Sequence, residues 1–246
     1  MSTSPNPGSP SQPLASAAGS GSADQPALQP AHTLHHAQTT ALVDVGRQFD
    51  RPVTTVNLPL TRASSVLFKT LADAEAEGTA AVAGERHRTT YATSGTPTTF
   101  ALTDALAEIE GAGHACRAAI MPSGLAAISV PLLAYCKPGD HILMSDSVYG
   151  PARTFATTML ARYGVATEFF DPHVGAGIAA LLRPNTRIVY LESPGSYTFE
   201  IQDVPAICKV ARAHGALTMI DNAWASPVFA RPFEWGLDIS LLPLTK

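Results

Sequence analysis

Short apolar runs alternate with longer amphipathic stretches between residues 100 and 242, and this alternation constrains the fold more than any other feature. The apolar runs have the length of buried strands, and the stretches between them carry apolar residues at helical spacing. An alternation of this kind predicts an α/β fold with a mainly parallel sheet covered by helices on both faces. We expect strands at 116–121, 141–145, 166–170, 187–191, 217–220 and 239–242, and helices at 66–77, 100–110, 123–135, 151–163 and 203–214.

The chain divides into three parts by composition. Residues 1–38 are rich in Ser, Pro, Ala, Gly and Gln without a hydrophobic period, which predicts a disordered tail. Three histidines in this tail (His32, His35 and His36) lack carboxylate or cysteine companions, so a solvated tail is favoured over a metal site. Residues 39–100 read as an arm that ends in a turn-rich loop, and residues 101–246 as the large domain.

Charge and hydropathy exclude several functional classes. With 16 Lys and Arg against 20 Asp and Glu, the net charge is −4, and no basic patch of the kind that binds nucleic acid is visible. No apolar run approaches the roughly 20 residues needed to cross a bilayer, so we expect no membrane association. The N-terminus lacks the basic residues of a targeting signal, and a cytoplasmic protein is therefore expected.

Polar residues that follow the strands are the candidates for chemistry, because ligands of open parallel sheets bind beyond the carboxyl ends of the strands. After the first expected strand, Ser123, Gly124 and Leu125 open a helix whose N–H groups could bind a phosphate. Ser123 is equally an ordinary helix N-cap. Tyr149 follows the second strand, where its ring could stack on a flat cofactor or simply pack in a loop.

Asp221 emerges from the buried run LTMI, where a carboxylate needs a compensating partner such as a protonated ring nitrogen. An N-cap or turn aspartate is the alternative reading. Lys246 ends the chain and is the only one of the four lysines that follows a sheet-like apolar run. A lysine amine in such a place can attack a carbonyl, although a terminal lysine can also be a solvated end.

In this order and spacing, the segments from Val53 to Lys246 resemble the Cys/Met-metabolism family of pyridoxal-phosphate (PLP) enzymes. The resemblance lies in GTPTTFALTDALAEIEG, DHILMSDSVYGP, FFDP, LRPNTRIVYLESPGS, DVPAI and IDNAWA. It implies the PLP-dependent transferase-like fold (fold type I), with a mainly parallel seven-stranded sheet and a smaller C-terminal domain. No counterpart of that C-terminal domain follows Lys246 in this sequence.

The resemblance also implies roles for particular residues. Lys246 would bind the cofactor covalently and later move the α-proton, and Tyr149 would stack on the pyridoxal ring and assist proton transfer. Asp221 would hold the ring nitrogen. Ser123, Gly124, Leu125 and Thr245 would hold the phosphate, with Tyr91 reaching it from a neighbouring subunit through the arm.

The implied reaction is a carbon–sulfur β-elimination that converts cystathionine to homocysteine, pyruvate and ammonia. The ESPGS and DNAWA segments favour this reaction over those of the γ-synthases and γ-lyases. The implied partners are a small sulfur amino acid as substrate and identical subunits in a homodimer or homotetramer. No metal is implied.

The sequence departs from the family pattern in three places. Thr93 stands where the family commonly has an arginine for the phosphate, and Pro243 stands where many relatives have a small residue, often serine. The third departure is the missing C-terminal domain, from which we expect little lyase activity of these 246 residues alone. Another trans-sulfuration reaction (γ-lyase, γ-synthase or sulfhydrylase) and a catalytically inactive fragment remain the alternatives.

Overall fold

The computed structural model describes residues 42–46 and 55–245. The expected tail at 1–38 and the expected cofactor lysine Lys246 lie outside the described residues. In chain order the elements are α2 (Leu71–Val82), η1 (Ala92–Ser94), α3 (Pro97–Gly111), α4 (Gly124–Tyr135), β1 (His141–Ser145), α5 (Gly150–Phe155), η2 (Ala156–Leu160), β2 (Ala166–Phe170), η3 (Gly175–Ala180), β3 (Thr186–Glu192), α6 (Val204–His214), β4 (Leu217–Asp221), α7 (Ser226–Phe229), η4 (Pro232–Trp235) and β5 (Ile239–Leu241).

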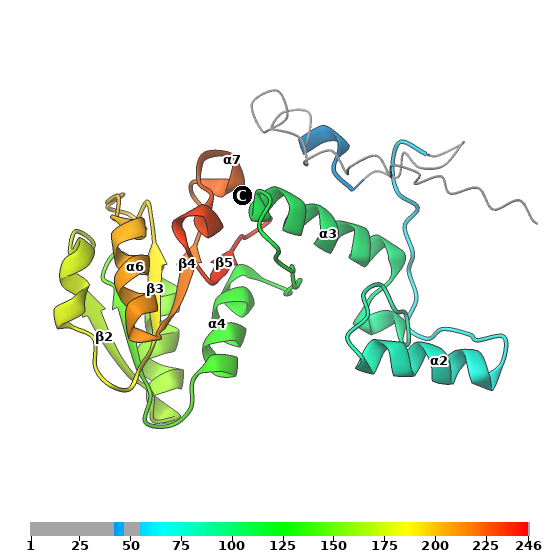
Figure 1. Ribbon diagram of the computed structural model, residues 1–246, viewed down its shortest axis with the longest axis horizontal. Helices are drawn as coiled ribbons and strands as arrows, with labels where there is room; N and C mark the ends of the chain where they lie inside the picture. Colours follow the sequence, from blue (N-terminus) through cyan, green and yellow to red (C-terminus); the bar gives the residue numbers. More distant parts are fainter. Residues whose placement is uncertain (1–41, 47–54, 246) are drawn as a thin grey trace, which may run out of the picture. The chain divides into compact units, whose positions relative to one another are not determined.

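Five parallel strands form one sheet in the order β2-β1-β3-β4-β5 (Figure 1). β1 and β3 are neighbours although β2 lies between them in the sequence, so the chain moves outward from β1 to β2 and then turns back past β1 to β3. The parallel sheet confirms the α/β prediction. Within the described part of the chain the sheet has five strands, whereas the family resemblance implied seven.

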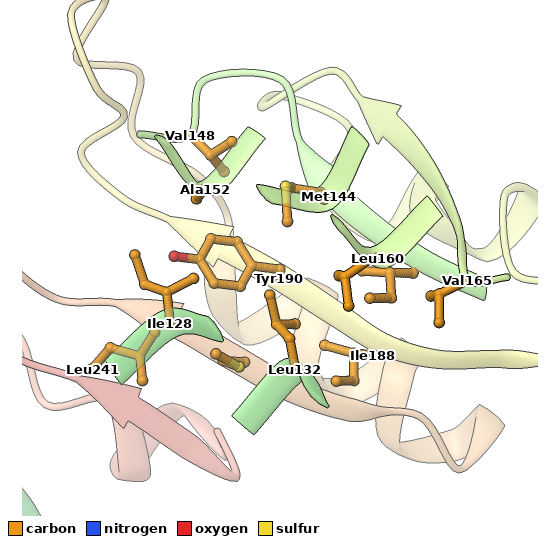
Figure 2. Close-up of a cluster of buried hydrophobic side chains, with 13 residues drawn as sticks. Ile128, Leu132, Met144, Val148, Ala152, Leu160, Val165, Ile188, Tyr190 and Leu241 are labelled. Atoms are coloured by element: carbon orange, nitrogen blue, oxygen red, sulfur yellow. The ribbon is translucent and has the colours of Figure 1, made fainter. Parts of the chain in front are cut away.

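Two hydrophobic clusters cover the two faces of the sheet. On one face, α4 and α5 pack against side chains of β1, β3 and β4, and Figure 2 shows the Tyr190 ring among Ile128, Leu132, Val148 and Ala152. On the other face, α6 and η3 pack against the alternate residues of the same strands. Because successive residues of a strand point to opposite faces, strands buried on both sides are nearly continuously apolar, as the sequence showed.

Local signals place the helix ends. α2 begins five residues later than expected because Thr70 and Asp73 form a reciprocal capping box. α6 begins after Asp203, whose carboxylate accepts the Ala206 N–H at 3.1 Å. The helix expected at 151–163 begins as α5 and continues as the π-helical stretch η2.

The strand expected at 116–121 does not form in the structure. A strand depends on a hydrogen-bonded neighbour, and none of the five described strands pairs with this segment. Ile120 is 42% exposed, so the apolar run does not lie in a covered layer either. The prediction was wrong here because hydrophobic patterning indicates a strand but cannot supply its partner.

The described helices include none that is both long and apolar enough to span a bilayer.

Candidate active site at the carboxyl edge of the sheet

The carboxyl ends of β1, β3, β4 and β5 lie at one edge of the sheet, because all the strands are parallel. The register places Glu192 of β3 beside Asp221 of β4, and Asp221 beside Leu241 of β5. Tyr149 follows β1, Asp221 ends β4 and Thr245 follows β5, so the topology gathers these three expected site residues at a single edge. Ser123, Gly124 and Leu125 follow none of the described strands, because the strand expected before them does not form.

The loop at Ser123 and Gly124 packs against the last segment of the chain. Ser123 caps α4, and its Oγ accepts the Ala126 N–H at 3.1 Å. A Cβ added to Gly124 would lie 3.4 Å from Cβ of Pro243, so glycine permits this close approach. The helix N-terminus expected to bind phosphate and the segment that leads to Lys246 are therefore neighbours.

Asp221 ends β4 and is only 7% exposed. Its Oδ1 accepts the N–H of Ala223 at 3.0 Å. Burial raises the pKa of the carboxyl, and the Ala223 N–H opposes this effect. A buried carboxylate of this kind gains from a cationic partner, which would restore its ordinary ionisation.

Glu192 is a second buried carboxyl at this edge, and it is not among the site residues predicted from the sequence. Its Oε2 accepts the Tyr149 N–H at 2.7 Å, and its Oε1 accepts the Ser196 hydroxyl at 2.5 Å. Burial raises the pKa of Glu192 to about 7, with a further contribution from the charge of Asp221. The signal was present in the sequence, since Glu192 directly follows the buried run IVYL just as Asp221 follows LTMI.

Tyr149 stands four residues beyond the end of β1 and precedes α5. Its backbone N–H is held by Glu192, whereas its side chain is 40% exposed. The structure therefore fixes the backbone of Tyr149 at Glu192 and leaves part of the residue accessible, which is the arrangement that stacking on a planar ligand requires.

The remaining expected site residues are exposed. Leu125 is 38% exposed in the first turn of α4, and Thr245 is exposed at the end of the described chain. Tyr91 is 48% exposed and its hydroxyl lies 3.3 Å from Oγ of Ser64 within the arm. Thr93 is also exposed. No described contact joins Tyr91 or Thr93 to the carboxyl edge, so the role of Tyr91 stays a prediction.

The donor set at this edge fits PLP. The cofactor carries a phosphate, a planar ring and a ring nitrogen that is cationic when protonated. The start of α4 offers backbone N–H groups to an anion, Tyr149 offers an exposed ring, and Asp221 offers a buried acid. The hydroxyl of Tyr190, fully buried near these carboxyls, has no hydrogen-bond partner among the described residues.

Comparison with known proteins agrees with this assignment. A model of the family described as Cys/Met metabolism PLP-dependent enzyme matches residues 39–246. The chain is 47% identical over 191 residues to a provisionally named cystathionine β-lyase of Rhizobium johnstonii, covering 78% of this chain and 46% of the relative. It is 40% identical over 209 residues to the cystathionine β-lyase of Escherichia coli K12, covering 84% of this chain and 51% of the relative.

Solved structures give the same fold. The cystathionine γ-lyase of Lactobacillus plantarum, complexed with L-serine, has a TM-score of 0.71 and 28% identity, with 83% of this chain and 49% of that chain covered. The chain thus spans about half the length of the relatives that it matches. On the match over residues 39–246, the chain belongs to the family of Cys/Met metabolism PLP-dependent enzymes.

Proposed function

We propose that this chain carries the cofactor-binding part of a carbon–sulfur lyase that converts cystathionine to homocysteine, pyruvate and ammonia by β-elimination. The Escherichia coli relative is named a cystathionine β-lyase, and the Rhizobium johnstonii relative bears the same name provisionally. The observation that carries the proposal is the buried carboxyl of Asp221, which lies beside Glu192 at the edge of the sheet where the Tyr149 loop is held.

Each site residue has a defined task in this proposal. Asp221 pairs with the protonated ring nitrogen, and the ring of Tyr149 stacks on the cofactor. The first turn of α4, from Ser123 to Leu125, binds the phosphate together with Thr245. Lys246, which lies outside the described residues, supplies the amine that binds the cofactor covalently. Lys246 follows shortly after Pro243, and Pro243 packs on Gly124 at the start of α4. This proximity supports a place for the Lys246 amine near the phosphate-binding turn.

The cofactor supplies an electron sink for the charge left at Cα when a proton is removed. The protein's part is to orient the reacting groups and to keep the ring nitrogen protonated, which a carboxylate at Asp221 favours. The amine of Lys246 would take the α-proton, and Tyr149 would assist that transfer from its position beside the ring. The bond between Cβ and sulfur then breaks, and the homocysteine thiolate leaves and takes up a proton. The aminoacrylate that remains is hydrolysed by one water to pyruvate and ammonia.

Covalent labelling tests the cofactor site. The purified chain is incubated with PLP, reduced with borohydride and digested, and the peptides are weighed by mass spectrometry. We expect a pyridoxyl group on Lys246 and a visible absorbance before reduction, both abolished in Lys246→Ala. A pyridoxyl group on Lys69, Lys137 or Lys209 instead, or no adduct, would overturn the proposal.

Product analysis tests the reaction type. β-Elimination from cystathionine yields pyruvate and homocysteine, whereas γ-elimination yields 2-oxobutyrate and cysteine. The second reaction is the main alternative because the matched Lactobacillus plantarum structure is a cystathionine γ-lyase. We expect pyruvate as the keto acid, and 2-oxobutyrate as the main product would favour the alternative. An adduct without any product would favour an inactive fragment.

We further propose that the active form is a homodimer or homotetramer in which the arm of one subunit brings Tyr91 to the phosphate of another. The exposure of Tyr91 and its lack of a described contact with the carboxyl edge of its own chain support an intersubunit role. Sedimentation analysis should give a mass of two or four chains. A monomer that still binds the cofactor with full affinity would contradict this arrangement.

A further inference from the structure

We propose that Glu192 is the positioning residue that fixes Tyr149 at the cofactor site by tying the loop after β1 to the loop after β3. This inference rests on the proposed function, because it concerns the same site. It begins from the observation that one buried side chain contacts both the loop after β1 and the loop after β3.

The tie at Tyr149 is direct. Oε2 of Glu192 accepts the Tyr149 N–H at 2.7 Å, and this residue stands at the start of α5 without any side-chain cap of its own. The N–H groups of a helix's first turn have no partners within the helix. Glu192 therefore supplies the acceptor that Tyr149 needs, from a strand that lies beside β1 in the sheet.

The second oxygen of Glu192 fixes the loop that follows β3. Oε1 accepts the hydroxyl of Ser196 at 2.5 Å, and the backbone N–H of Ser196 donates to the carbonyl of Ser147 at 2.7 Å. A Cβ added to Gly195 would lie only 2.4 Å from Oγ of Ser147, so the two loops are in close contact. Glu192 thus closes a ring of contacts around the backbone on which Tyr149 is carried.

Glu192 is placed to orient and not to react. Its side chain is 8% exposed and both of its oxygens are occupied by the two loops. Its titratable neighbours are Asp221 on β4 and Tyr190 on the same strand. Whether the carboxyl is ionised or protonated, one oxygen remains able to accept the Tyr149 N–H. A glutamine at this position can keep the same bond.

Amide exchange measured by NMR on the cofactor-free chain tests the tie residue by residue. In Glu192→Ala the Tyr149 N–H loses its acceptor, and we expect its exchange to accelerate at least about tenfold. In Glu192→Gln we expect exchange within about threefold of the wild type, because the amide oxygen replaces Oε2. Amides in the middle of β3 should not change in either variant.

Two further variants separate this role from a general loss of structure. Glu192→Asp keeps a buried carboxyl but shortens the side chain by one methylene, so it should also release the Tyr149 N–H even if the alanine variant does not fold. Glu200→Ala is the matched control. Glu200 lies in the same loop, and its carboxyl contacts Thr198 and not Tyr149, so its removal should leave Tyr149 exchange unchanged.

Cofactor affinity gives the functional readout. We expect Glu192→Ala to weaken PLP binding about tenfold through loss of preorganisation, with Glu192→Gln close to the wild type. Unchanged Tyr149 exchange in Glu192→Asp, or equal effects of glutamine and alanine, would overturn the inference. If the wild-type chain forms the Lys246 adduct but Tyr149 exchange is unchanged in Glu192→Asp, only this inference is refuted. If Tyr149 exchange accelerates in Glu192→Asp but the wild-type chain forms no adduct, only the proposed function is refuted.

Discussion

The two edges of the sheet use buried polar residues differently. At the amino edge, polar side chains close turns by bonding to one another and to the backbone: Nδ1 of His141 lies 2.9 Å from Oγ1 of Thr186, and Asn185 donates to the carbonyl of Gly139 at 2.8 Å. At the carboxyl edge, Glu192 and Asp221 are buried side by side, and their main partners are backbone N–H groups and a hydroxyl. The first arrangement serves the fold, whereas the second leaves acidic groups that a bound cation can stabilise.

The largest expected difference between the edges concerns cofactor affinity. Asp221→Asn removes the charge that would pair with the ring nitrogen, and loss of one partner from a buried ion pair costs about 3–5 kcal/mol. We therefore expect PLP to bind at least about 100-fold more weakly in a fluorescence titration.

Asp140→Asn is the matched control at the amino edge. Asp140 is also buried and accepts a backbone N–H, that of Lys137 at 2.8 Å. Because it lies at the opposite ends of the strands, we expect cofactor affinity to change less than about twofold. Equal losses of affinity at both positions would mean that the carboxyl edge has no special role.

Buried groups at the two edges should also change the free energy of unfolding with pH in opposite directions. Burial holds the pKa of Glu192 at about 7 in the folded chain against an ordinary 4.5, so the folded state binds this proton more tightly than the unfolded state. The free energy of unfolding should then fall by up to about 3 kcal/mol as pH rises from about 4.5 through 7. Asp221 and Glu110, whose pKa values burial also raises, act in the same direction.

His141 at the amino edge acts in the opposite direction, because burial lowers the pKa of its imidazole and stability is lost as pH falls through the unfolded value. Urea unfolding at several pH values between 5 and 8 measures the net effect. Glu192→Gln should flatten the decline on the alkaline side. An unchanged slope in that variant would assign the pH dependence to other groups.

Glycine substitutions should cost more at the carboxyl edge than at the amino edge. Gly195→Ala would place its Cβ 2.4 Å from Oγ and 2.5 Å from Cβ of Ser147, and such overpacking costs about 1–3 kcal/mol. Gly139→Ala meets no neighbouring atom within 4 Å but has φ of +92°, which costs about 1 kcal/mol. Chemical denaturation compares the two, and a smaller loss for Gly195→Ala would contradict the close packing of the loops.

The smallest expected effect is that of Ser123→Ala. Loss of the cap on α4 should reduce the free energy of unfolding by about 1 kcal/mol. Asp203→Ala, which removes the cap of α6, should reduce the free energy of unfolding by a similar amount. Only Ser123→Ala should also weaken cofactor binding, which a parallel PLP titration would show. Equal cofactor affinity in the two variants would argue that Ser123 is a cap alone.

Much of the secondary structure could be predicted from the sequence because apolar residues recur at the spacing of buried strands and of buried helix faces. The strand at 141–145 has the bounds that its apolar run indicated, and the helix after Asp203 buries the apolar face formed by Val204, Ile207, Cys208 and Ala211. Asp221 was identified because a carboxylate at the end of an apolar strand is costly without a partner. These inferences needed only neighbours along the chain.

Long-range contacts decided the rest. Residues 116–121 form no strand although their pattern is apolar, because a strand needs a hydrogen-bonded neighbour that the local sequence does not specify. The packing of Gly124 on Pro243 joins segments about 120 residues apart, and the tie from Glu192 to Tyr149 joins two loops through neighbouring strands. The sequence by itself determined the apolar runs of β1, β3 and β4, the apolar face of α6 and the acidic residues that end β3 and β4. Only the tertiary structure decided which of these groups face one another, because strand order and register bring them together.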